Sequence, residues 1–330
     1  MLEVMERGAE TYYFPNKNKK AGGILYGKYR NTLAKRRGEA PEIVESENAD
    51  PVEEVTASDE FSTFWLQTNV APKTRVFDHW QKTFSQRYLT ITTAENKLQT
   101  ILEEWPILKQ SFGHDLIKQD FDLRFPDNKV DFESKWMQFR EGFLELAQTR
   151  TKESFSLDIL KKFQTENVSE GTLDTGILLI LHSVLVPTAR RIIKKPNNKK
   201  IGVKVTIADS RNSFYIQFAT SGELETAIQD QIDIQLKNKD CLQPIICGIG
   251  PSVLEANEFF VYFADIFYKF ESIIAAVEAC FKIFYVLNLK YPESCKLVWL
   301  FIQEFFFNFP IPGCDMHPSV KSLANDLKKN

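Results

Sequence analysis

Residues 271–307 read "ESIIAAVEACFKIFYVLNLKYPESCKLVWLFIQEFFF" and contain two helical patterns with large apolar faces. In the first pattern, Glu271, Glu278 and Lys282 fall within about 40° of one another around a helix, which leaves the remaining surface apolar. Glu278 and Lys282 are also spaced as a favourable i,i+4 ion pair. A helix with so narrow a polar stripe is typical of a protein core, so a buried C-terminal helical pair is expected.

The second helix of this pair has a wider polar face and an aromatic stripe opposite to it. The polar face consists of Glu293, Lys296, Gln303, Glu304 and Asn308. The stripe consists of Val298, Trp299, Ile302, Phe305 and Phe306. Such a stripe is usually core, and where it stays uncovered it is a partner surface. The alternative to burial is therefore a partner surface formed by Trp299, Phe305 and Phe306.

The segment before this pair combines helical and strand signals, and residues 206–310 are predicted to form an α+β region. "LQPIICGIGP" is a short apolar run bounded by proline and glycine, which favours a strand. "NEFFVYFADIFYKFE" alternates like a strand, yet its charged residues would also share one helical face, so periodicity leaves both open. Residues 209–220 predict one helix, and a second helix is expected to begin near Glu223.

Residues 61–187 are predicted to be helical throughout. Phe132, Trp136, Phe139 and Phe143 recur at helical spacing, and Pro106 should end or kink an earlier helix. Ser154 or Ser156 is expected to cap the helix that follows. The predicted fold class is therefore α+β and predominantly α-helical. In it, a helical N-terminal layer is joined by a small β hairpin or sheet packed on the C-terminal pair, and residues 311–330 form a flexible tail.

The N-terminal residues separate their charges into two blocks. Residues 1–38 form a basic segment in which positions 17–37 hold eight Lys or Arg and no acid. Residues 39–60 hold nine Asp or Glu and no base, with little apolar surface, so they predict a disordered acidic linker. The basic block interleaves its charges with Tyr26 and Tyr29, which suits nucleic-acid contact. The candidate nucleic-acid-binding residues are Lys28, Arg30, Lys35, Arg36 and Arg37.

A second basic stretch, "ARRIIKKPNNKKIGVKV", lies within residues 188–205 and holds seven Lys or Arg without an aromatic residue. The apolar run before it, Ile177 to Val186, is too short for a bilayer, which needs about 20 residues. A membrane anchor is therefore not expected. Pro196, Asn197 and Asn198 favour a turn, so the stretch is predicted to be a solvated connecting loop.

No pattern in the chain predicts catalysis, a cofactor or a metal. Phosphate-binding loops, a nucleophile elbow and an H-E-x-x-H motif are all missing from the sequence. The densest polar cluster, at His114, Asp115, Asp120, Asp122 and Asp127, is expected to cap and solubilise a turn between helices. A degenerate metal-dependent hydrolase centred on Asp115 and Asp120 is the minor alternative. Five cysteines without C-x-x-C spacing predict reduced thiols rather than disulfides.

The order of several segments resembles a known family. "HSVLVPTARRIIKK", "TIADSRNSFYIQF", "LQPIICGIG" and the 272–307 pair follow "GGILYGKYRNTLAKRR" and "WPILKQSFGHDLIKQDFDLRF". Together they are similar to the C-terminal region of sterile alpha motif domain-containing protein 3-like proteins and related uncharacterised animal proteins, over residues 20–310. The resemblance implies paired strands in residues 258–270 and brings no catalytic residue. The residues before position 20 are too few for a sterile alpha motif.

Two functions follow as expectations. The first is a non-enzymatic protein-interaction or scaffold module that binds an unidentified protein or a second copy of itself. The alternative is a nuclear protein that binds DNA or RNA through residues 17–37, although a net charge of −3 confines such binding to local patches. The first residues lack the pattern of a signal peptide, so an intracellular location is expected, with the nucleus slightly favoured over the cytoplasm.

Overall fold

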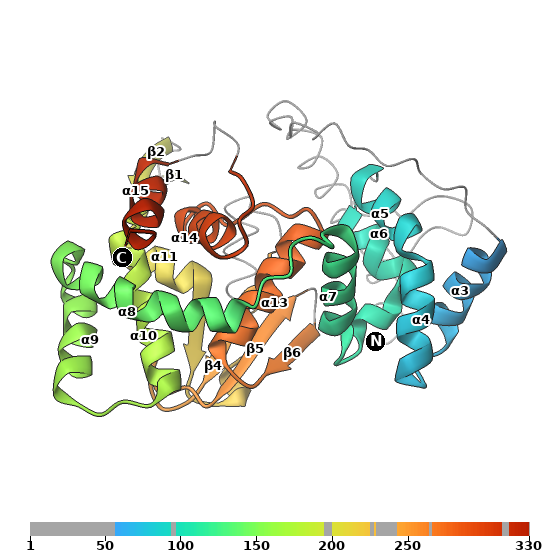
Figure 1. Cartoon of the computed structure of the whole chain (residues 1–330), viewed down its shortest axis with the longest axis horizontal. Coiled ribbons are helices and arrows are strands. Elements are labelled where there is room, and N and C mark those ends of the chain that lie inside the picture. Colours follow the sequence, from blue (N-terminus) through green and yellow to red (C-terminus); the bar gives the residue numbers. More distant parts are fainter. Residues whose placement is uncertain are drawn as a thin grey trace, which may run out of the picture. The chain divides into compact units, whose positions relative to one another are not determined.

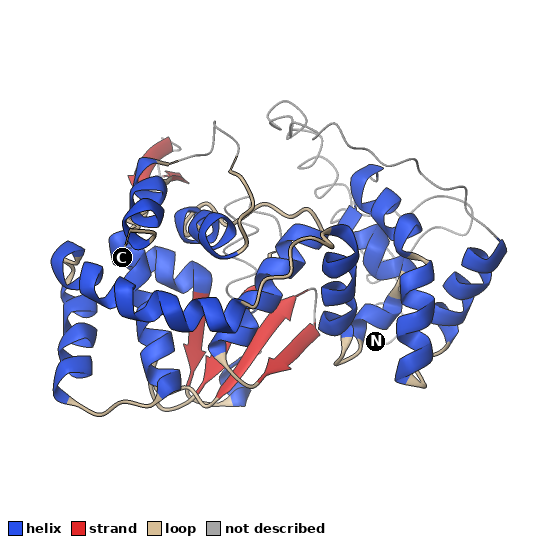
Figure 2. Ribbon diagram, viewed as in Figure 1, coloured by secondary structure: helices blue, strands red, loops and turns tan. Residues whose placement is uncertain are grey.

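The computed structural model describes residues 57–93, 97–194, 200–224, 228, 243–263, 266–311 and 317–329. These residues belong to one unit that spans Asp50–Asn330. Helices make up most of it, with a four-stranded sheet and a separate two-stranded hairpin (Figure 2). The predicted α+β, predominantly helical fold class is confirmed. None of the described helices is long and apolar enough to span a bilayer.

The sheet has the strand order β3–β4–β5–β6, which is also the order along the chain. Its strands are β3 (Tyr215–Phe218), β4 (Ile245–Ile249), β5 (Glu258–Phe263) and β6 (Ile266–Phe270). Strands β3 and β4 pair in parallel, and the other two pairs are antiparallel. Residues 258–270 are thus a hairpin rather than a helix. Ile246 packs in the main core while Cys247 packs in a smaller cluster, so β4 is buried on both faces.

The C-terminal helical pair packs beside this sheet, and α13 (Ile273–Val286) crosses it (Figure 1). The Ser272 hydroxyl accepts a hydrogen bond from the Ala275 amide at 3.1 Å, which satisfies one free donor at the start of α13. Helix α14 (Lys296–Phe301) continues without a break into a π-helical turn, η2 (Ile302–Phe306). The ring of Phe281 on α13 stacks on Phe307 at 3.9 Å. The expected buried helical pair is therefore present.

The predicted helical region before residue 187 is helical, and it begins at Ala57. Its first group comprises α3 (Ala57–Thr68), α4 (Lys73–Lys82), α5 (Phe84–Thr93), α6 (Lys97–Glu104), the 3₁₀ helix η1 (Pro106–Lys109) and α7 (Gly113–Arg124). Its second group comprises α8 (Phe132–Arg150), α9 (Ser154–Thr165) and α10 (Glu170–Val184). Pro106 follows the end of α6, as expected. The α9 cap is the Glu153 carboxylate rather than Ser154 or Ser156, and it accepts from the Ser156 amide.

Three segments differ from the sequence predictions. Helix α11 (Ile207–Phe214) ends early, and Tyr215–Phe218 forms a strand because it pairs with β4. The predicted basic loop contains a β-hairpin of β1 (Arg190–Lys194) and β2 (Lys200–Lys204). The predicted flexible tail contains α15 (Pro318–Leu327), since its apolar residues fill a gap in the core. The acidic linker lies outside the described residues except at its end, where residues 57–60 begin α3.

Side chains of one half of the unit donate hydrogen bonds to backbone carbonyls of the other half across long sequence separations. Four such contacts are called the clasp hydrogen bonds. They are Arg124 Nη1 to Tyr285 O at 3.2 Å, Asn128 Nδ2 to Phe307 O at 2.6 Å, Lys135 Nζ to Phe306 O at 2.7 Å and Tyr268 Oη to Leu108 O at 2.6 Å. The partners are 160 to 179 residues apart in sequence. The N-terminal helices and the C-terminal pair therefore form one core.

Candidate interaction surfaces

Two of the three residues predicted as a partner surface, Trp299 and Phe306, are packed in the core, so the prediction is wrong for them. Trp299 is 1 % exposed and Phe306 is 0 % exposed, whereas Phe305 is half-buried. The Trp299 ring packs on Phe214 at 4.7 Å and on Phe284 at 5.1 Å. These two rings come from α11 and α13, so neighbours on both sides cover the stripe.

The expected polar face is exposed at Glu293 and Asn308 and half-buried at Lys296 and Glu304, and it is buried only at Gln303, within the π-helical turn. A π turn adds a residue to the helical repeat and rotates the side chains that follow. Gln303, expected on the polar face, is 5 % exposed. Its amide donates to the Pro310 carbonyl at 3.1 Å and its carbonyl accepts from the Tyr291 hydroxyl at 3.1 Å. The buried glutamine is thus satisfied by internal partners.

The most exposed aromatic side chains of the described residues lie on α3 instead. Phe61 is 60 % exposed and Phe64 is 64 % exposed. Positions 61 and 64 are i and i+3 on one helix, so the two rings share a face. The opposite side of α3 buries Ser62 and Leu66. We call Phe61, Phe64 and the adjoining Trp65 the α3 aromatic face.

His79 of α4 packs against the α3 aromatic face. The His79 ring stacks on Trp65 at 4.5 Å and meets the edge of Phe61 at 5.8 Å. Its Nδ1 lies 3.0 Å from the Ser62 hydroxyl. Burial lowers the pKa of His79, and the nearby charge of Lys82 lowers it further. The neutral ring therefore holds two aromatic side chains in place at neutral pH.

The β1–β2 hairpin is the second exposed surface, and its base is fixed to the fold. The Val205 amide donates to the Ala189 carbonyl at 3.0 Å, and Val205 is buried. Arg191 forms an ion pair with Asp209 of α11 at 2.6 Å. Burial acts to raise the pKa of Asp209, but hydrogen bonds from Thr206 and Arg191 outweigh it, and the pKa is lowered. The carboxylate is therefore ionised when it anchors the hairpin.

One face of the hairpin carries cations and an exposed isoleucine. The register pairs Arg190 with Lys204, Ile192 with Gly202 and Lys194 with Lys200. Arg190 and Lys204 are exposed, and Ile192 is 68 % exposed because its cross-strand neighbour has no side chain. Like charges directly opposite each other destabilise a strand pair. The hairpin therefore retains an arrangement that costs stability.

The predicted acidic cluster is not a turn and does not gather as a metal site. Most of it lies on α7, where Asp120 is 3 % exposed and Asp115 pairs with Lys73 at 2.9 Å. Asp120 accepts two hydrogen bonds from Arg87, from Nε at 2.9 Å and from Nη2 at 2.5 Å. No group of three His, Cys, Asp or Glu side chains within the described ranges could hold a metal ion. The cluster is divided between a buried ion pair and a surface one.

His182 and Ser210 form a buried polar pair that the sequence does not indicate. Nδ1 of His182 lies 2.8 Å from the Ser210 hydroxyl, and the two residues are 0 % and 1 % exposed. Burial lowers the pKa of His182 to about 3, with a smaller contribution from Arg211. Because both groups are buried, the pair contributes polar packing within the core.

The buried His182 predicts a pH dependence of stability. Its folded pKa is below the ordinary value of about 6.5, so the unfolded chain binds an extra proton as the pH falls below about 6.5. We expect His182 to contribute a loss of about 1.4 kcal/mol of unfolding free energy per pH unit, from about pH 6 toward pH 3. Urea unfolding between about pH 7 and pH 5, where few carboxylates titrate, measures it.

The variant His182→Asn should lose this part of the slope, since its side chain does not titrate. Ser210→Ala is the control because it leaves the imidazole buried and should keep the slope. An equal slope in wild type and His182→Asn would show that His182 does not titrate on unfolding.

A groove of about 520 Å³ lies between α7, the segment after it and α13. Its lining includes the cations Lys118, Lys129 and Lys282 and the acids Asp122, Asp131 and Glu278. Lys282 is nearly buried and pairs with Glu278 at 2.8 Å. The charges balance, so the groove favours neither an anion nor a cation.

The described cysteines are free thiols. Cys247, Cys280 and Cys295 are buried and unpaired with one another. Burial raises the pKa of Cys247 and that of Cys295 to about 12, so both are protonated at neutral pH. They are therefore unreactive core residues.

The predicted nucleic-acid residues Lys28, Arg30, Lys35, Arg36 and Arg37 lie outside the described residues. No protein-family model, curated protein or solved structure matches the chain. The resemblance to the sterile alpha motif domain-containing protein 3-like region therefore stays a prediction.

Proposed function

We propose that this chain is a non-enzymatic protein-interaction module whose docking surface is the α3 aromatic face. The exposure of Phe61 and Phe64 carries the proposal, because the other aromatic candidates for a docking surface are packed in the core. Aromatic rings are enriched among the residues that dominate binding energy at interfaces. His79 holds the Phe61 and Trp65 rings of this face in place, which lowers the entropy cost of docking.

The double variant Phe61→Ser, Phe64→Ser tests this surface. Each ring is mostly exposed, so unfolding free energy should change little, while partner affinity should fall by at least about 30-fold, the loss of one strong hot spot. Light scattering over a concentration series and cross-linking measure self-association. A partner identified by cross-linking is then purified and titrated against both forms.

Met137→Ser is the matched control, because Met137 is 54 % exposed on α8, away from α3. This variant should bind as the wild type does. A wild-type chain that stays monomeric, and whose every purified partner binds the double variant equally well, would contradict the proposal.

Nucleic-acid association through residues 17–37 is the second candidate, and the exposed cation pair of the hairpin favours it. Neutralising Lys35, Arg36 and Arg37 should weaken binding to DNA or RNA and lower its salt dependence. Absence of any binding at about 50 mM salt would remove this candidate.

A further inference from the structure

We propose that the β1–β2 hairpin is a binding site for duplex DNA, separate from the α3 aromatic face and from residues 17–37. The sequence alone favours a solvated loop here, but the structure builds a ribbon of two five-residue strands, each about 17 Å long. A two-stranded ribbon fits the major groove of B-form DNA, which is about 12 Å wide.

Charge complementarity identifies the partner as a polyanion. Arg190 and Lys204 face each other and are exposed, and neither forms an ion pair with any described acid. The stem of Arg190 runs along Gly202, with Cδ 3.8 Å from where a Cβ would stand. Among the described residues the two cations therefore have no counterion on this face, and phosphates placed against it would relieve their repulsion.

The apolar residue of this face and the absence of aromatic residues favour duplex DNA over other nucleic acids. Ile192 lies next to the cation pair, and an exposed aliphatic side chain can contact the thymine methyl group in the major groove. Single strands are bound by stacking on aromatic rings, and residues 189–205 contain none. The major groove of A-form RNA is too deep and narrow to admit side chains. Duplex DNA is the nucleic acid that fits.

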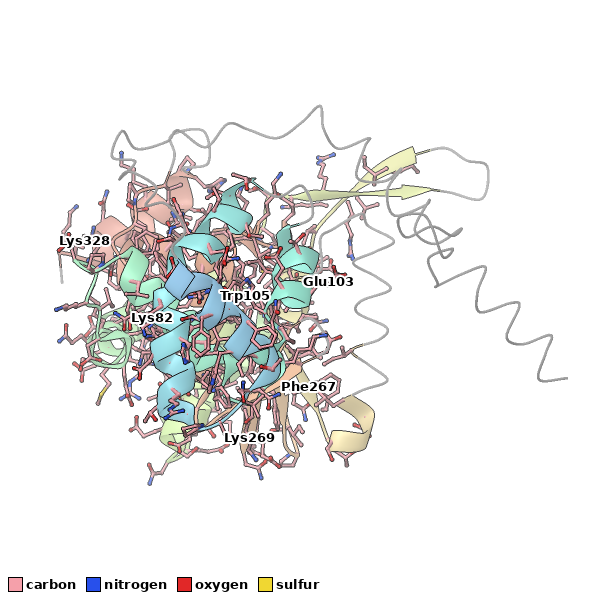
Figure 3. All side chains as sticks on the ribbon, turned by 90° about the vertical axis from the view of Figure 1, so that its right-hand side faces the viewer. Lys82, Glu103, Trp105, Phe267, Lys269 and Lys328 are labelled. Atoms are coloured by element: carbon pink, nitrogen blue, oxygen red, sulfur yellow. The ribbon has the colours of Figure 1, made fainter. Side chains whose placement is uncertain are left out.

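The hairpin is also held firmly enough to present these groups. The Arg191–Asp209 ion pair and buried Val205 join it to α11, while its cation face stays exposed. Figure 3 shows the two strands extending away from the bulk of the described side chains. A duplex could therefore approach this face without displacing any of the packed elements that the structure describes.

The test is a titration of the full chain with a fluorescent DNA duplex at several salt concentrations between about 50 and 200 mM. The variant Arg190→Gln, Lys204→Gln removes two phosphate contacts. We expect the slope of log affinity against log salt to fall by about 1.8, and affinity at about 0.1 M salt to fall roughly 60-fold. Ile192→Ser should weaken binding yet keep the slope, because it removes no charge.

Two further variants test whether an effect on binding comes from the hairpin site, from a change in net charge or from misfolding. Arg75→Gln, Lys82→Gln removes the same charges from exposed positions on α4, and its affinity should stay within about twofold of wild type. Lys82 lies well apart from the hairpin (Figure 3). Arg190→Glu places a carboxylate opposite Lys204, so it should stabilise the strand pair while it weakens DNA binding. Loss of binding in this variant cannot come from unfolding.

Several outcomes would overturn the proposal. Equal effects of the hairpin and α4 variants would show that only net charge matters. Complete loss of binding on neutralising Lys35, Arg36 and Arg37 alone would place the site in residues 17–37. Tighter binding of single-stranded DNA, of duplex RNA or of a peptide with the acidic sequence of residues 39–56 would assign the hairpin to that partner instead.

Discussion

Replacing Arg87 with methionine should lower the unfolding free energy by about 3 to 5 kcal/mol, measured by urea denaturation at neutral pH. Arg87 is 1 % exposed, and its guanidinium donates to Asp120, Thr83 and the Trp80 carbonyl. Its Cζ also lies 3.5 Å from the centroid of the Trp80 ring. The substitution leaves the Asp120 carboxylate buried without its cation, which is the costly state.

The double variant Arg87→Met, Asp120→Leu is the decisive comparison. Burial raises the pKa of Asp120 and lowers the pKa of Arg87, so desolvation acts against both ions. Removing both charges together should therefore recover most of the stability lost in Arg87→Met. A double variant that stays as unstable as Arg87→Met would show that the pair is net stabilising relative to the apolar side chains that replace it.

Replacing Trp299 with alanine should cost about 3 to 5 kcal/mol of unfolding free energy, because it opens a large cavity in the core. The Trp299 ring is enclosed by Phe214 and Phe284 and stacks on Tyr291 at 6.0 Å. Urea denaturation and near-ultraviolet circular dichroism measure the loss of stability and of fixed aromatic packing.

Phe64→Ala, on the exposed α3 aromatic face, is the matched control and should change stability by no more than about 0.5 kcal/mol. If Trp299→Ala kept full stability and lost only partner binding, the aromatic stripe of α14 would be a docking surface after all.

Features that depend on local spacing could be predicted from the sequence. The apolar positions of α8 and α13 recur every three or four residues, and burial of such a face is required wherever the helix packs. The sequence of β5 and β6 is compatible with either strands or a helix, because alternating apolar residues and helically spaced charges coexist in the same residues. Its pairing with β4 decides in favour of strands.

Features that depend on distant partners could not be predicted. Tyr215–Phe218 becomes a strand through residues about thirty positions later, and Arg87 meets Asp120 across 33 residues. In β1 the residues come in like pairs, Arg-Arg and Ile-Ile, so no alternating pattern indicates a strand. Helix α15, in contrast, could have been predicted from its sequence. Pro318 stands at its first turn, and Val320, Leu323 and Ala324 follow at helical spacing.

The exposed candidate surfaces were the least predictable part. Aromatic content is highest in the C-terminal third, which suggests a surface there, yet the sheet and α8 cover those rings. The exposure of the α3 rings can be recognised only once the packing of their neighbours is known. Exposure is a property of the whole packing, and residue type does not encode it.

The clasp hydrogen bonds also affect folding during translation. Asn128 reaches the Phe307 carbonyl across 179 residues, and at a translation rate of about 5 to 20 residues per second its partner is synthesised about 10 to 35 s later. Until then Phe121, Phe132 and Phe139 on α7 and α8 lack the C-terminal rings of Phe306 and Phe307 against which they pack. We expect the nascent chain to expose these rings to solvent until the C-terminal helical pair is synthesised. A chain truncated before α14 would keep them exposed.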